Sequence, residues 1–133
     1  MSMQEISGLL EVHLAAMVGA LPAADENINF DATGQPFWRV NHIPNQPAER
    51  ALTLDVTEWR GLLQVTLSFP LGEGRGDAQA VGDKLAEHFR PPLTLAGASR
   101  KVSITDPVFV GAGRPEEGRW VLPVTVSWAA LRI

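Results

Sequence analysis

Residues 60–89, RGLLQVTLSFPLGEGRGDAQAVGDKLAEHF, contain the change of pattern on which the fold depends. The first third of this stretch alternates between apolar and polar residues, with Leu63, Val65, Leu67 and Phe69 on one side and Gln64, Thr66 and Ser68 on the other. A period of two is typical of a β-strand with one buried face. The stretch therefore predicts a half-buried strand that stops at Pro70.

The second half of the same stretch changes to helical spacing. Asp77 follows three glycines in the place of an N-cap, where its carboxylate can accept free backbone N–H groups. After it the apolar residues recur every three or four positions, at Ala78, Val81, Leu85 and Phe89. The sequence thus predicts a strand, a glycine turn at 72–76 and a helix that folds back over the strand's apolar face.

The preceding part of the chain predicts one helix and one strand. An amphipathic helix is expected from Met3 to Gly19 or Ala20, because apolar residues form a helical stripe at Ile6, Leu9, Leu10, Leu14, Met17, Val18 and Leu21. Ile28 and Phe30 indicate a short extended piece, and residues 37–43 (FWRVNHI) indicate a strand with Trp38, Val40 and His42 on one face. Residues 44–59 are expected to form a long loop that holds a weak edge strand at 51–56.

The C-terminal part predicts a hairpin. A strand is expected at 101–104, with a continuation through 108–110, then a long tip at 111–118 and a last strand with alternating apolar residues from Trp120 to Trp128. The fold class that follows is α+β. We expect a four- to five-stranded antiparallel or mixed sheet with two helices packed on one face.

Composition narrows the class of protein. A length of 133 residues fits a single domain, 1–133, and 45% hydrophobic with 20% charged residues is ordinary for a folded chain. No apolar run approaches the roughly 20 residues of a membrane span. The absence of cysteine excludes thiol chemistry and favours an intracellular setting. A net charge of −4 argues against non-specific nucleic-acid binding, because phosphate contacts need a basic surface. This argument concerns the average charge, and a local basic patch is compatible with it.

Motifs for catalysis, metals or cofactors are weak. Gly72-Glu73-Gly74-Arg75-Gly76 lacks the Gly-Lys-Ser/Thr ending of a P-loop, and its acidic neighbours would repel phosphate. The histidines at 13, 42 and 88 have no metal-ligand spacing, and no serine sits in a nucleophile elbow. We therefore expect no catalytic residues, no metal and no cofactor.

Tryptophans next to arginines are the more informative signal, at Trp38-Arg39, Trp59-Arg60 and Arg119-Trp120. Both residue types are favoured where protein surfaces meet. For Trp38 and Trp120, packing in the core is an equally good explanation of the aromatic side chain. Trp59, placed in the predicted loop, is the better interface candidate.

A succession of motifs runs along the whole chain. After the N-terminal helix come Asn27, Phe30, Gly34, Pro36 and Phe37, in the pattern N-x-x-F-x-x-x-G-x-P-F. The strand and glycine turn GLLQVTLSFPLGEG follow, then a helix that ends in His88-Phe89, and a terminal GRWVLPVTVSW segment. In this order the motifs resemble the tail terminator, or tail-completion, proteins of long-tailed bacteriophages and prophages, and the resemblance covers essentially the whole chain.

This resemblance implies a structural protein without catalysis. It implies a homo-oligomeric ring, expected to be a hexamer that can be monomeric in isolation, which caps the tail tube, ends its polymerisation and joins the head connector or head-completion protein. DNA could pass through the ring without sequence-specific contact, and no membrane is involved. The implied location is the bacterial host cytoplasm during assembly and then the head-proximal end of the virion tail.

The expected oligomer or tail-tube interface combines charged and aromatic residues: Arg39, Trp59, Arg60, Glu73, Arg75, Arg114, Glu116 and Glu117. Two alternatives stay open. One is a head–tail joining (neck) protein, and the other is a small α+β enzyme or ligand-binding domain that uses the groove between sheet and helices.

Overall fold

The computed structural model describes residues 3–24, 36–44, 48–49, 57–70, 74–98, 100–116 and 118–132. Within these ranges the chain forms two helices, α1 (Met3–Ala15) and α2 (Gly74–His88). The strands are β1 (Ala23–Ala24), β2 (Phe37–Pro44), β3 (Ala48–Glu49), β4 (Thr57–Pro70), β5 (Leu93–Ala96), β6 (Arg100–Ile104), β7 (Phe109–Val110), β8 (Arg114–Glu116) and β9 (Arg119–Arg132).

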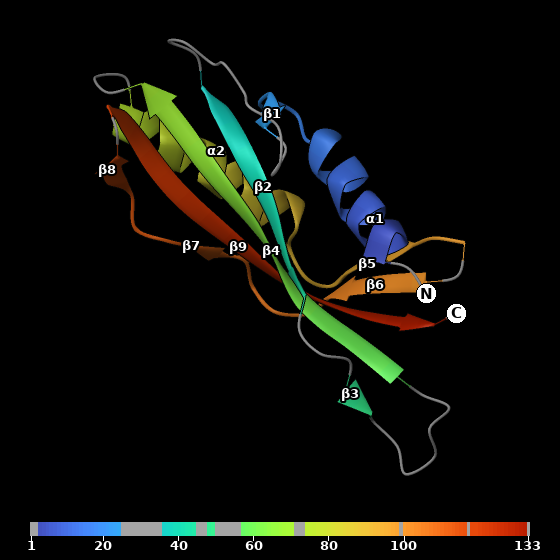
Figure 1. The fold of residues 1–133 in the computed structure, drawn as a ribbon. Coiled ribbons are helices and arrows are strands. Elements are labelled where there is room, and N and C mark those ends of the chain that lie inside the picture. Colours follow the sequence, from blue (N-terminus) through green and yellow to red (C-terminus); the bar gives the residue numbers. More distant parts are fainter. Residues whose placement is uncertain are drawn as a thin grey trace.

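Two long antiparallel strands, β4 and β9, form the centre of the sheet (Figure 1). Each has 14 residues, and the register places Leu63 opposite Val126, Val65 opposite Val124 and Leu67 opposite Leu122. Side chains that are directly opposite point to the same face. The alternation read from the sequence in 60–70 and 120–128 therefore produces one continuous apolar face across both strands.

The sheet is mixed, with the order β1-β2-β4-β9-β6-β5. β2 pairs antiparallel with β4, while the short β1 pairs parallel with β2. Along the other edge of β9, three strands pair in turn: β6, β7 and β8. Residues 100–116 thus run antiparallel along β9 and pair with it in three separate short strands.

The predicted α+β class is confirmed, but the predicted number of strands is wrong. The described residues contain a 9-stranded sheet instead of four or five strands. The strands that the sequence reading missed are β1, β3, β5 and β8, each of two to four residues. A segment this short cannot display a period, so its pairing depends on neighbours that are distant in sequence.

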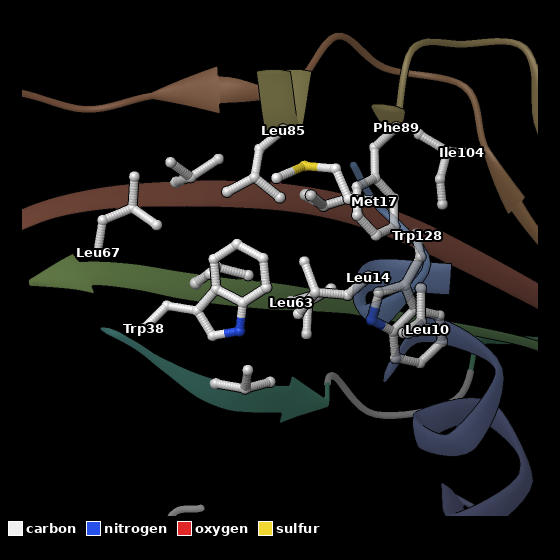
Figure 2. Close-up of a cluster of buried hydrophobic side chains, with 14 of the residues drawn as sticks. Leu10, Leu14, Met17, Trp38, Leu63, Leu67, Leu85, Phe89, Ile104 and Trp128 are labelled. Carbon is white, nitrogen blue, oxygen red and sulfur yellow. The ribbon is translucent and has the colours of Figure 1, made fainter. Parts of the chain in front are cut away.

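One apolar core lies on the helix-bearing face of the sheet (Figure 2). Trp38 of β2, Leu63 and Leu67 of β4, and the even-numbered residues of β9 from Leu122 to Ala130 are buried there. Helix α2 lies against β9, β4 and β7, whereas α1 lies against β5 and β6. The helix packing thus differs in detail from the prediction, because only α2 lies directly over the central strand pair.

The helix boundaries also differ from the predicted ones. α1 ends at Ala15 and not at the predicted Gly19 or Ala20. The residues after Ala15 form turns, and Gly19 has a left-handed φ of 85°, which is typical of a helix C-terminus. α2 begins at Gly74, so Asp77 lies in its first turn and is not the N-cap. A carboxylate in the first turn still interacts favourably with the positive end of the helix dipole.

The predicted loops are also shorter than expected. The long tip at 111–118 contains β8, which brings Glu116 opposite Arg119, and Gly118 has the φ of 79° that a tight hairpin turn requires. In the predicted loop 44–59, β3 pairs with the start of β4 at Thr57 and Glu58. The expected strand at 51–56, and the pair Ile28 and Phe30, lie outside the described residues.

Candidate interaction surfaces

The face of the sheet opposite the core carries short polar side chains. Their positions follow from the register, which places Asn41, Gln64 and Thr125 side by side across β2, β4 and β9. Thr66 and Ser127 continue this face, and all five side chains are half-buried. We call this surface, formed by the side chains that alternate with the core residues on β2, β4 and β9, the open sheet face.

Arg39 and Arg60 belong to the open sheet face. Arg39 lies opposite Thr66, and Arg60 lies opposite Ala129. Thr66 and Arg60 are six positions apart along β4, so the positions of Arg39 and Arg60 are separated by roughly 20 Å along the strand direction. The sheet therefore presents both predicted interface arginines on one surface, with Arg39 half-buried and Arg60 exposed.

Trp59 lies in a different environment from the one expected. It is in β4, opposite Ala130, and its half-buried ring packs against the core cluster. Trp120 is likewise half-buried against the core, and Trp38 is fully buried. Tryptophan next to arginine thus reflects strand alternation at these sites, with the aromatic ring directed to the core and the arginine to the open sheet face.

Arg114 and Glu116 meet at the hairpin end of the sheet. They form an exposed ion pair in β8, with 2.9 Å between Arg114 Nη2 and Glu116 Oε2. An exposed pair of this kind contributes little to folding stability. Next to them, Arg119 donates to the Ser68 hydroxyl at 2.6 Å and lies over the Phe37 ring at 5.0 Å.

The remaining predicted interface residues are only partly visible. The backbone of Arg75 lies in the first turn of α2. Glu73 and Glu117 lie outside the described residues. The sheet thus brings Arg39 and Arg60 onto one face and pairs Arg114 with Glu116, and the role of all eight residues at an interface stays a prediction.

A groove of about 460 Å³ lies between α1 and the β1–β2 edge of the sheet. Apolar residues line it, among them Val12, Leu14, Leu21 and Trp38. Among the described residues that line the groove, only Glu11 is titratable, and its carboxylate accepts a hydrogen bond from His42 Nε2 at 2.8 Å. The lining residues that the structure describes include no serine or threonine that the His42–Glu11 pair could activate as a nucleophile.

The histidines connect the first helix to the rest of the fold, which the sequence reading did not anticipate. The chain has three histidines. His42 on β2 bonds to Glu11 of α1, while His13 at the end of α1 stacks on His88 at the end of α2, with ring centroids 4.0 Å apart. These contacts join residues 31 and 75 positions apart, so no local spacing in the sequence could have revealed them.

Among the described residues, no group of three or more His, Asp or Glu side chains could hold a metal ion. No helix in the described part of the chain is long and apolar enough to cross a membrane.

The fold and these surfaces define a small α+β protein whose polar and charged side chains gather on the open sheet face, the hairpin end and the helix ends. A family model of phage tail terminator proteins matches residues 5–128, and the chain belongs to this family. The family is structural, so the chain is a structural protein of phage tail assembly.

One solved structure also has the same fold. It superimposes with a TM-score of 0.79 over 98% of this chain and 96% of its own chain, at 24% sequence identity. Its name describes no activity, so the likeness concerns the fold alone. A search of curated proteins finds no match.

Proposed function

We propose that this protein caps the phage tail tube as a homo-oligomeric ring, a hexamer, and thereby ends polymerisation of the tube protein. The observation that carries the proposal is the tail terminator family match over residues 5–128. The chain acts as one domain, 1–133, without catalysis or a cofactor. It assembles in the host cytoplasm and then remains at the head-proximal end of the tail, where its outer surface receives the head connector or head-completion protein.

Two chemically different surfaces support assembly as a ring. Head-to-tail contacts close into a ring only if each subunit presents two distinct, complementary surfaces. The open sheet face carries Arg39 and Arg60, whereas the exposed carboxylates Asp77 and Asp83 lie on α2. Opposite charges on two sides of one subunit favour a directional contact between neighbours and disfavour like faces meeting.

The test is a tube-assembly assay with the purified tail-tube protein of the same phage. Tube length is measured by electron microscopy with and without this protein, and the mass of the free and tube-bound protein is measured by native mass spectrometry. A cap that stops growth gives a narrow length distribution that stays constant as tube protein is added. Tubes in its absence continue to lengthen.

Two outcomes would contradict the proposal. Tubes of the same controlled length without this protein would remove the terminator role. A protein that leaves tube length unchanged but binds the isolated head connector would instead fit the head–tail joining alternative. A mass other than six subunits on the capped tube end would correct the hexamer alone.

A further inference from the structure

The stacked rings of His13 and His88 form a reciprocal contact between the ends of two helices. His13 Nε2 donates to the backbone carbonyl of His88 at 2.9 Å, and His88 Nε2 donates to the carbonyl of His13 at 2.5 Å. A carbonyl oxygen can only accept, so both rings carry their proton on Nε2 in this arrangement. The rings lie nearly parallel, at 14°, and Phe89 packs edge-on against both.

One added proton is compatible with this contact. Protonation adds a hydrogen to Nδ1 and leaves the Nε2–H bond to the carbonyl in place. That bond becomes charge-assisted, and the carbonyls at a helix C-terminus favour a nearby cation. A single charge shared by His13 and His88 therefore keeps α1 attached to α2.

A second proton is not compatible with it. Two imidazolium rings would face each other at a centroid distance of 4.0 Å in a part-buried site. Like charges this close oppose each other's ionisation. The charged groups next to His88 along α2 and just after it are Lys84, whose ammonium lies near Gly19, and Glu87 and Arg90, which pair with each other. On α1, Glu11 is two residues before His13 and bonds to His42.

Protonation has the opposite effect on the contact between Glu11 of α1 and His42 of β2, which it strengthens. His42 and Glu11 are 2.8 Å apart, and a protonated His42 turns this hydrogen bond into an ion pair. Glu11 is therefore the charged partner on the β2 side of α1, two residues before His13. Acid strengthens this contact while it weakens the His13–His88 stack.

We propose that the His13–His88 stack is a proton-operated clamp that holds the C-terminal end of α1 on α2 near neutral pH and releases it in mild acid, while His42–Glu11 retains α1 on β2. Imidazole is the side chain that changes charge between about pH 8 and pH 5. The released state binds one proton more than the clamped state, so acid favours release. Release frees the helix end that lines the groove next to Leu14 and Leu21, and the groove widens.

Amide hydrogen exchange of the full chain tests the clamp. Opening that takes up one extra proton lowers the protection factor by about tenfold per pH unit, after correction for the intrinsic exchange rate. We expect this slope for the last turn of α1 below about pH 6.5. The variant His88→Gln, whose amide can still donate to the carbonyl but cannot gain a charge, should lose the slope. The matched variant His42→Gln should keep it.

An equal slope in His88→Gln and in the unmodified protein would overturn the proposal, and so would the absence of a slope in the unmodified protein. A second variant covers the case in which His88→Gln folds poorly. His13→Gln removes the other ring of the stacked pair and should also lose the slope. A slope that persists in His13→Gln would refute the clamp.

Discussion

Leu67 lies in the second half of β4, opposite Leu122 of β9, and its side chain is fully buried in the core. Replacing it with alanine removes apolar contacts and leaves a cavity that the close-packed neighbours fill only in part, so we expect Leu67→Ala to lower the free energy of unfolding by about 2–5 kcal/mol. The adjacent Thr66→Ala, on the half-exposed open sheet face, should change it by less than about 1 kcal/mol. Denaturant titration of both variants measures this difference, and equal losses would mean that the buried face is assigned incorrectly.

Two glycines show why single residues in this fold cannot be judged from local sequence. A Cβ on Gly61 would lie 2.4 Å from Trp128 Cζ2, and a Cβ on Gly113 would lie 2.5 Å from Trp120 Cζ2. Each indole ring therefore occupies the space that a side chain at the glycine would need. The requirement for glycine arises from a tryptophan elsewhere in the chain, and neither site has a positive φ that would mark it as a turn.

Helix α1 contains one glycine at a helical position and is followed by another in a left-handed turn, and the two should respond oppositely to alanine. Gly8 is exposed in the helix, and a Cβ there would meet nothing within 4 Å, so Gly8→Ala should stabilise the protein by about 0.5–1 kcal/mol. Gly19, with its φ of 85°, ends the turns after the helix, so Gly19→Ala should destabilise it by about 1 kcal/mol. Thermal unfolding of both variants tests the signs, and stabilisation by Gly19→Ala would contradict the observed turn.

Among the secondary-structure elements, the sequence predicted the long strands whose apolar residues alternate. Residues 63–69 and 120–128 alternate over enough positions to identify β4, β9 and the shared core face. β5 and β8 were missed because their four and three residues are strands only through pairing with β6 and β9. Boundaries failed for a related reason, since β9 continues to Arg132 where β6 offers a partner that no local pattern reveals.

The contact surfaces of the whole molecule were less predictable than its fold. The register explains why Arg39 and Arg60 share a face, and alternation alone could have placed them opposite the core. The His13–His88 stack and the groove along α1 could not be foreseen, because each requires the exact separation of two helices or of a helix and an edge strand. Those separations are set by the packing of large side chains such as Phe89 and Trp38.

Charge reversal on the open sheet face tests whether this surface takes part in assembly. Arg60 is exposed at a strand position directed away from the core, so Arg60→Glu should change folding stability by only about 0.5 kcal/mol. If Arg60 faces a carboxylate of the neighbouring subunit, the substitution places like charges together, and ring closure weakens. Tail tubes grown with this variant should then exceed the length reached with the unmodified protein.

The matched control is Arg90→Glu, which makes the same change in charge at the end of α2, where Arg90 pairs with Glu87 at 3.2 Å. It should preserve tube length. Normal tubes with Arg60→Glu would remove this residue from the interface, and equally long tubes with both variants would show that net charge, and not the open sheet face, governs assembly.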